Sequence, residues 1–362
     1  MKALAALAVA LVAIAIVVAA YRADPDKTIE AREAREAKKA QESKFSSPSV
    51  VLSINAGKAS PFTAPPSNPR ASPLAAEFDK ARALKPLYDR LMAPGGAATG
   101  DAKFILYKIL STCVPEAAGV SAADLQQARA KRRQQLEAQI PQASQDRAKR
   151  LAMYDQMMSG ERCAGFESVT ATKDDIDKLL KDAAAEGDPK ARARLATREL
   201  DASFVPPAPG KPANFNGPAL TDTQLQTFRD AIASRDPEAI VIAGTALSVT
   251  FRDAVIEVGP THEELQSRAS MEAWRMVACE YGLDCGPESR TLQEACAYQG
   301  YCAATTVPDL VYFYGVSPYE AQLIDQYRQV FRNAAANNDW SGLEVARRAN
   351  TSGNRFYFSS SP

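Results

Sequence analysis

Residues 183–200 read Ala-Ala-Ala-Glu-Gly-Asp-Pro-Lys-Ala-Arg-Ala-Arg-Leu-Ala-Thr-Arg-Glu-Leu and predict two helices joined by a tight turn. The carboxylate of Asp188 can accept hydrogen bonds from the free N–H groups at the start of the second helix. Small side chains after the turn, such as Ala191 and Ala196, allow the two helices to approach closely. The expected local unit is therefore an αα-hairpin.

Three other segments share this turn, namely Ala98-Thr-Gly-Asp-Ala102, Ala233-Ser-Arg-Asp-Pro237 and Ala336-Asn-Asn-Asp-Trp340. The hairpin at 183–200 resembles one unit of the Sel1-like and tetratricopeptide-like helical repeat proteins of the bacterial envelope. The resemblance implies a helical scaffold that holds partners on a concave face. The four turns follow one another at unequal intervals, however, whereas solenoids keep a fixed period. Ordinary capped turns in a non-repeat helical domain explain them equally well.

The composition favours an all-α fold with almost no strand, because the chain is rich in alanine and its 23 prolines indicate stiff linkers. The 362 residues have room for one large or two small domains. We expect two small helical subdomains of αα-hairpins, tied by disulfides. The expected segments are a signal peptide or signal anchor at 1–21, a charged juxtamembrane helix at 22–45, a Pro-rich linker at 46–73, helical subdomain 1 at 74–204, a Pro/Gly linker at 205–219, helical subdomain 2 at 220–350 and a tail at 351–362.

Capping patterns predict several helix starts. A Ser or Thr is followed three residues later by an acidic residue or Gln at Ser121, Thr172, Thr221 and Ser317, and Pro318 adds a first-turn proline to the last of these. Apolar periodicity predicts one helix over 74–91, kinked at Pro86. The apolar stretch 239–258 is expected to be buried on most faces.

The N-terminus predicts a location outside the cytoplasm. An apolar run from Ala3 to Ala20 is long enough for a minimal membrane span, and the small residues Val18 and Ala20 also suit cleavage of a signal peptide. Both outcomes stay open, so the protein is expected in the periplasm, either anchored to the inner membrane through residues 3–21 or soluble after cleavage. Basic residues after the run oppose this orientation and leave a cytoplasm-facing anchored protein as the alternative.

Six cysteines support export, because disulfides form in oxidising compartments. The four late cysteines allow three pairings. We favour Cys279 with Cys285 and Cys296 with Cys302, which leaves Cys113 to pair with Cys163; a nested pairing of the late four fits almost as well. The spacing lacks the close pairs of zinc knuckles and contains no Cys-x-x-Cys, so no metal or redox site is expected.

Catalytic and cofactor motifs are missing from the sequence. It contains no Gly-rich phosphate loop, no Gly-x-Ser-x-Gly and no His-Glu-x-x-His, and its single histidine, His262, is expected at a helix start on the surface. We expect no cofactor. Nucleic-acid binding has no electrostatic support, because 43 basic residues balance 43 acidic ones.

The sequence therefore favours a non-catalytic, envelope-associated helical binding or scaffold protein whose partner is an unknown envelope protein or polymer. Trp274, Tyr312 and Tyr314 are the aromatic side chains expected to line a groove for that partner. An enzyme acting on an envelope polymer is the alternative, and it requires two carboxylates about 5–9 Å apart in a cleft. A structural spacer is the third possibility and requires no concave site.

Overall fold

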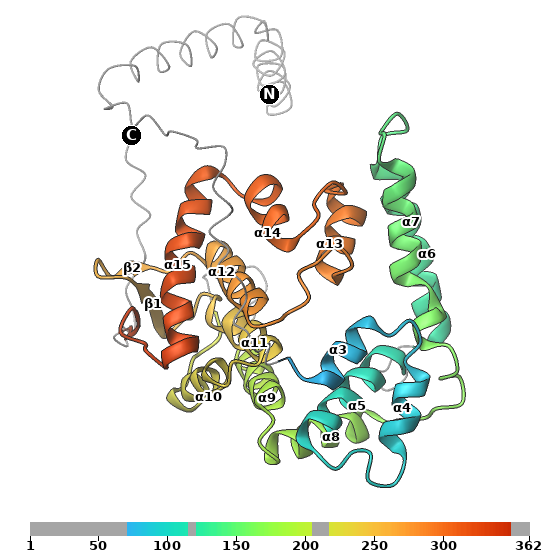
Figure 1. Cartoon of the computed structure of the whole chain (residues 1–362), viewed down its shortest axis with the longest axis horizontal. Coiled ribbons are helices and arrows are strands. Elements are labelled where there is room, and N and C mark those ends of the chain that lie inside the picture. Colours follow the sequence, from blue (N-terminus) through green and yellow to red (C-terminus); the bar gives the residue numbers. More distant parts are fainter. Residues whose placement is uncertain (1–70, 115–120, 205–216, 349–362) are drawn as a thin grey trace, which may run out of the picture. The chain divides into compact units, whose positions relative to one another are not determined.

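The computed structural model describes residues 71–114, 121–204 and 217–348 (Figure 1). The chain divides into two units, Met1–Pro61 and Phe62–Pro362, and every described residue belongs to the second. The expected signal or anchor segment, the charged juxtamembrane helix, nearly all of the Pro-rich linker and the tail lie outside the described residues. Within the described part, no helix combines the length and apolar character that crossing a membrane requires.

The described chain is mostly helical, as expected. Its helices are α3 (Pro73–Lys80), α4 (Lys85–Met92), α5 (Gly100–Cys113), α6 (Ala122–Gln139), α7 (Arg147–Met158), the 3₁₀ turn η2 (Gly160–Cys163), α8 (Lys173–Ala185), α9 (Pro189–Ala202), α10 (Asp222–Ala233), α11 (Pro237–Leu247), α12 (Ser267–Glu280), α13 (Arg290–Glu294), the π-helical turn η3 (Ala295–Gln299), α14 (Val307–Asp309), the π-helical turn η4 (Leu310–Gly315) and α15 (Pro318–Asn337). Its strands are β1 (Ala254–Val258), β2 (Glu263–Glu264) and β3 (Leu343–Arg347).

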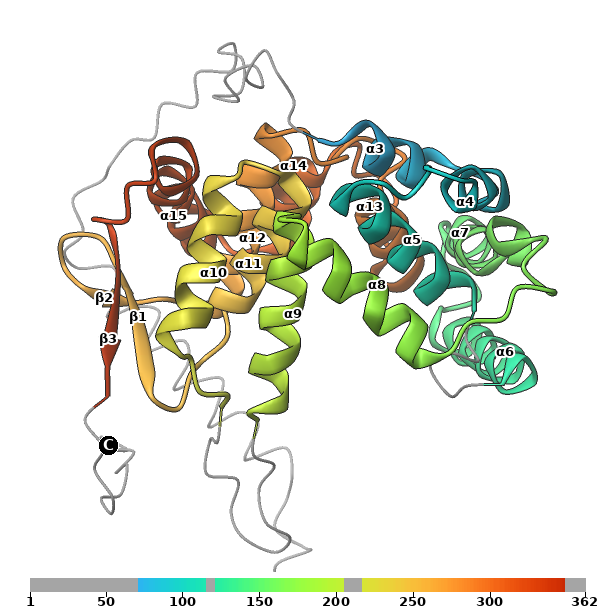
Figure 2. The same cartoon turned by 90° about the horizontal axis from the view of Figure 1, so that it is seen from below.

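The helices pack in a chain of neighbours that links early and late parts of the sequence. Helix α5 packs on α8, α8 on α9, α9 on α10 and α11, α11 on α12, and α12 on α15 (Figure 2). The largest hydrophobic core joins side chains from both sides of 205–219, whereas a smaller core lies among α3, α4, α5 and α8. The division into two subdomains at 205–219 stays a prediction.

Local capping signals give the observed helix starts. Thr172 with Asp175, Thr221 with Gln224 and Ser317 with Glu320 each form a capping box. The expected kinked helix over 74–91 is instead two helices, because the chain leaves α3 after Lys80 and begins α4 at Lys85. Pro86 lies in the first turn of α4, where a missing N–H costs no hydrogen bond.

A small antiparallel sheet accompanies the helices of a chain that was expected to contain almost no strand. The apolar stretch 239–258 divides into two elements: α11, which is buried on most faces as expected and ends at Leu247, and residues 254–258, which form β1 at the centre of the order β2-β1-β3. Burial alternates along β1, with Ala254, Ile256 and Val258 buried. This period of two is typical of a half-buried strand, and β1 pairs with β3 along its whole length.

Three disulfides tie the described chain, and they are the pairs favoured by the spacing. Cys113 is bonded to Cys163, Cys279 to Cys285, and Cys296 to Cys302. The first joins the end of α5 to η2. The other two close short loops after α12 and across Gly300, which adopts the left-handed backbone conformation. No cysteine is free, so none of them supplies a thiolate to a metal or a redox centre.

Trp274 lies in the centre of the largest core. Its side chain is 1% exposed and stacks on Phe331, with ring centroids 3.9 Å apart. Gly244 on α11 makes this close packing possible, because a Cβ added there would lie 2.3 Å from Cγ of Trp274. The indole therefore stabilises the α11–α12–α15 packing and has no surface left for a ligand.

Candidate functional site

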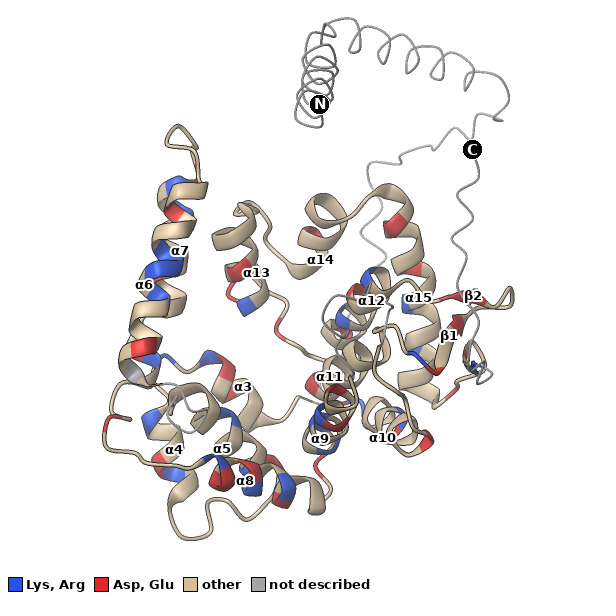
Figure 3. Cartoon of the chain, turned by 180° about the vertical axis from the view of Figure 1, so that it is seen from behind, with Lys and Arg blue, Asp and Glu red and all other residues tan. Residues whose placement is uncertain are grey.

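A charged cavity of about 900 Å³ lies against α3, α5, the start of α11 and the segment 282–293. This volume is in the range of small-molecule sites. We call it the charged cavity. Its ionisable lining residues are Asp79, Lys80, Arg82, Lys108, Glu161, Arg162, Asp236, Glu238, Asp284, Glu288 and Arg290. Figure 3 shows that α5, α8 and α9 each carry both basic and acidic residues.

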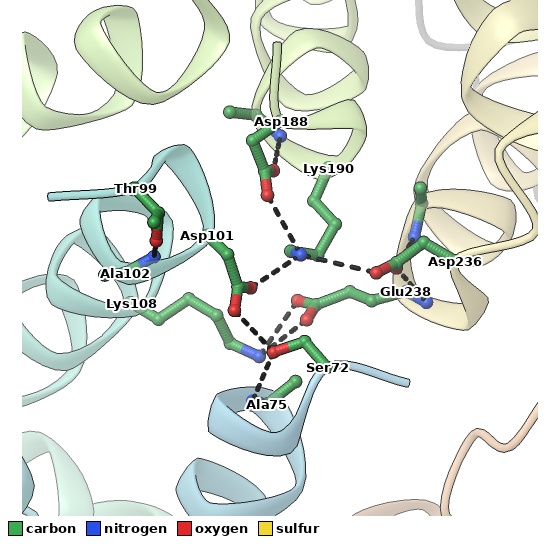
Figure 4. Close-up of polar contacts among 12 residues, drawn as sticks. Ser72, Ala75, Thr99, Asp101, Ala102, Lys108, Asp188, Lys190, Asp236 and Glu238 are labelled. Atoms are coloured by element: carbon green, nitrogen blue, oxygen red, sulfur yellow. Dashed lines mark hydrogen bonds and ion pairs between the residues drawn. The ribbon is translucent and has the colours of Figure 1, made fainter. Parts of the chain in front are cut away.

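A buried lysine holds three helix starts together behind the cavity wall. The ammonium of Lys190, whose side chain is 2% exposed, lies 2.9 Å from Asp101 Oδ1, 3.0 Å from Asp188 Oδ2 and 3.3 Å from Asp236 Oδ2 (Figure 4). Burial by itself lowers the pKa of Lys190, but Asp236, Asp188 and Asp101 together outweigh it, so the pKa is raised. The lysine therefore stays charged throughout the physiological range.

The same three aspartates belong to the recurring turns seen in the sequence. Asp188 caps α9 by accepting from the Ala191 N–H, and Asp236 caps α11 by accepting from the N–H groups of Glu238 and Ala239. Asp101 does not cap a helix: it is the second residue of α5, and Thr99 is the N-cap of that helix. Ser72, the N-cap of α3, donates to Asp101 over 2.6 Å. Four helix starts thus converge on Lys190 directly or through Asp101.

The fourth recurring turn has a different role. Asp339 accepts from the Ser341 N–H, and the segment after it continues into β3 rather than into a helix. The expectation that all four turns join helices is wrong at this position, because residues 343–347 pair with β1.

A second lysine links two carboxylates on the cavity wall itself. The Lys108 ammonium lies 2.9 Å from Glu238 and 4.0 Å from Asp79 Oδ1. Since both carboxylates contact one nitrogen, their nearest oxygens are at most about 7 Å apart. Glu238 is the second residue of α11, two positions after the Asp236 cap, so the Lys190 cluster helps to fix its position.

Both of these carboxylates have raised pKa values. Burial raises the pKa of Glu238, although Lys108 opposes the change. Burial also raises the pKa of Asp79, against Lys108 and Arg162 and with help from the nearby negative charge of Asp284. The side chain of Asp79 lines the cavity and is 43% exposed. A new cationic neighbour would stabilise the charged form of such a carboxylate.

Arg162 supplies the other fixed cation of this wall. Its guanidinium lies 4.6 Å from the ring centre of Phe78 and donates through Nη2 to the Phe78 carbonyl. The Leu84 N–H donates to the Arg162 carbonyl, which holds η2 against the start of α4. Nε of Arg162 is buried, and no described residue accepts from it.

The charges of the cavity wall and the Lys190 cluster do not cancel. The cavity lining holds six carboxylates, those of Asp79, Glu161, Asp236, Glu238, Asp284 and Glu288, against the five cations Lys80, Arg82, Lys108, Arg162 and Arg290. Behind the wall, Asp101 and Asp188 join Asp236 around the single ammonium of Lys190. The lining and the Lys190 cluster together therefore carry a small excess of negative charge, which favours a cationic group.

The aromatic residues expected to form a binding groove lie elsewhere. Trp274 is in the core, Tyr312 donates over 2.6 Å to Asp325, and Tyr314 is 41% exposed beside Tyr301. None of these three lines the charged cavity. The sequence offered a partial signal for the cavity in its Asp-containing turns, but it offered none for Asp79, Lys108 or Arg162.

His262 occupies a hairpin turn rather than the expected helix start. It has φ +53° in the left-handed region, between β1 and β2, since residues 254–258 and 263–264 pair as strands. Its imidazole lies beside Glu257 and Glu344. The ligand atoms of these three described residues all lie within 4.8 Å of one another.

The chain matches no family model, no curated protein and no solved structure. The resemblance of 183–200 to Sel1-like hairpins stays a prediction. Any functional argument therefore rests on the side chains themselves.

Proposed function

We propose that this protein is a non-catalytic binding protein of an oxidising compartment on the envelope side, and that its charged cavity binds a small ligand with a cationic group. The observation that carries the proposal is that Asp79 and Glu238 line a cavity of about 900 Å³ and share the ammonium of Lys108. Three disulfides are typical of proteins outside the reducing cytoplasm.

The proposal follows from the electrostatics of the wall. Asp79 is the carboxylate with room for a ligand, because it is partly exposed to the cavity and 4.0 Å from its nearest ammonium. A ligand ammonium beside Asp79 replaces lost solvation and offsets the repulsion from Asp284. Arg162 and Arg290 provide positive charge for a carboxylate elsewhere on the same ligand. A short peptide with free ends has this distribution of charge.

Three triglycine derivatives that differ in the charge of their ends test whether the cavity selects a cationic group. We expect the cationic triglycine amide and the zwitterionic triglycine to bind more tightly than the anionic N-acetyl-triglycine, when each is titrated at millimolar concentration and followed by protein NMR shifts. Asp79→Asn and Glu238→Gln should each lower the affinity for triglycine amide by about tenfold, which is the contribution of one charge-assisted contact. Asp182→Asn, on the exposed side of α8, is the control and should leave binding unchanged.

Two outcomes contradict the proposal. Equal or tighter binding of N-acetyl-triglycine shows that the acidic wall does not select the ligand. Absence of shifts at cavity residues with all three peptides shows that the cavity takes no such ligand.

The same two carboxylates favour a second candidate, hydrolysis of a glycan of the envelope. Their separation of at most about 7 Å and their raised pKa values match a general acid with a nucleophile or base. The Lys108 ammonium favours binding over this candidate, since it occupies the space where water or a sugar must lie.

Release of reducing ends from purified peptidoglycan distinguishes the two candidates. The hydrolase predicts a turnover in the wild type that Asp79→Asn and Glu238→Gln each reduce by at least about 100-fold. Product formation that survives both substitutions, or no product from the wild type, excludes catalysis by this pair.

A further inference from the structure

We infer that Glu257, His262 and Glu344 form a binding site for a divalent transition-metal ion, with Zn²⁺ the best match. Their ligand atoms, one imidazole nitrogen and two carboxylate oxygens, all lie within 4.8 Å of one another. The site is on the solvent face of the small sheet, opposite the face that packs on the core, because Glu257 lies between the buried residues Ile256 and Val258 of β1. It is separate from the charged cavity.

The two distances from the imidazole to the carboxylates fit a common metal centre. Nδ1 of His262 lies 3.3 Å from Glu257 Oε2 and 3.4 Å from Glu344 Oε2. Two ligands bound at about 2.0–2.2 Å to one tetrahedral zinc ion are about 3.3–3.5 Å apart. An imidazole with carboxylates is a donor set that suits Zn²⁺, and three protein ligands leave a fourth position open.

The sheet register places like charges opposite each other, which a cation would offset. Glu257 on β1 pairs directly with Glu344 on β3 and with Glu264 on β2. Directly opposed carboxylates on one face of a sheet repel each other and destabilise the pairing. Arg348 lies 3.8 Å from Glu264 and offsets that charge. Glu257 and Glu344 face the imidazole of His262, which is neutral when it binds a metal.

The backbone fixes all three ligands. Glu257 and Glu344 are held by a five-residue antiparallel ladder, and the hairpin turn holds His262 in the left-handed conformation. The Gly259 N–H donates to the Gly342 carbonyl, which ties the hairpin to the start of β3. A metal at this place therefore cross-links β1, the hairpin turn and β3.

The chain composition allows an unusually clean test, because His262 is the single histidine and all six cysteines are in disulfides. The full chain, prepared without a histidine tag, is titrated with ZnCl₂ by calorimetry and by ¹H–¹⁵N NMR of the imidazole. We expect one zinc ion per chain, a shift of the Nδ1 resonance on binding, and reversal by EDTA.

Three variants decide whether these residues are the ligands. His262→Asn keeps a residue that tolerates positive φ, and Glu344→Gln keeps the side-chain shape; each should weaken Zn²⁺ binding by more than about tenfold. Glu263→Gln is the matched control, because Glu263 pairs with Val258 rather than with Glu257, and its affinity should equal that of the wild type.

Melting temperatures with and without Zn²⁺ distinguish a metal-binding role of Glu344 from a purely structural one. Without metal, Glu344→Gln should raise the melting temperature, since it removes one of two opposed charges, while it lowers the rise that Zn²⁺ produces. Zinc binding that is unchanged in His262→Asn, or absent from the wild type, overturns the inference.

Discussion

Lys190→Met is expected to lower the free energy of unfolding by about 3–5 kcal/mol at neutral pH. The substitution leaves Asp101, Asp188 and Asp236 without the ammonium that they share at 2.9–3.3 Å. Buried charges that lose their partner cost far more than exposed ones, and Asp188 is 6% exposed. The capping of α9 and α11 depends on the same carboxylates, so their repulsion also weakens two helix starts. Urea unfolding, followed by circular dichroism, gives the difference.

The loss of unfolding free energy in Lys190→Met should be smaller at low pH. Burial already raises the pKa of Asp188 despite Lys190, and without the lysine that pKa rises further. An acid whose pKa is higher in the folded than in the unfolded state stabilises the fold below its unfolded pKa and loses this contribution as the pH rises through the folded one. The variant is therefore closest to the wild type near pH 4 and furthest from it above neutral pH. In the wild type, the raised pKa of Lys190 keeps its contribution intact up to strongly alkaline pH.

Two comparisons separate charge from packing. Lys178→Met removes a 72%-exposed lysine paired with Asp182 on α8 and should cost less than about 1 kcal/mol. Adding Asp188→Asn and Asp236→Asn to Lys190→Met should restore part of the stability, because Asn caps helices as well as Asp but carries no charge. A deficit in Lys190→Met that is independent of pH, or no gain from the asparagines, contradicts the electrostatic account.

The sequence predicted the features that depend on neighbouring residues. Thr172, Thr221 and Ser317 were recognised as helix starts because a capping box involves residues only three positions apart. Disulfide partners followed for the same reason, since Cys279–Cys285 and Cys296–Cys302 each close a short loop at a turn. The aspartates of the recurring turns at 188 and 236 were correctly expected to cap the next helix.

Features that depend on distant residues were not predicted. The convergence of Asp101, Asp188 and Asp236 on Lys190 requires the packing of α5, α9 and α11, which no local pattern contains. The alternation of Ala254–Val258, followed by a Gly-Pro-Thr-His turn, was a signal for a strand and hairpin. It was obscured because the apolar α11 precedes it and its main partner, β3, lies far along the chain.

The Cys113–Cys163 disulfide is expected to contribute more stability than either of the others. Its bond closes a loop between residues 50 positions apart, whereas each of the other two spans 6 positions. On the loop-entropy account, Cys113→Ala/Cys163→Ala should lower the free energy of unfolding by about 4 kcal/mol, and Cys279→Ala/Cys285→Ala by about 2 kcal/mol. Urea unfolding of the two double variants beside the wild type measures both values.

This disulfide also bears on the charged cavity, because Cys163 follows Arg162 directly and η2 carries both residues. Without the bond, Arg162 keeps its contacts to Phe78 and Leu84, but η2 loses its covalent tie to α5, the helix that carries Lys108. Cys113→Ala/Cys163→Ala should therefore lower the affinity for triglycine amide as well as destabilise the fold. Cys279→Ala/Cys285→Ala should also destabilise the fold but have a smaller effect on this affinity. An equal loss of stability in the two double variants refutes the loop-entropy account. Unchanged peptide affinity in the first shows that the α5–η2 contacts hold this wall of the cavity without the covalent bond.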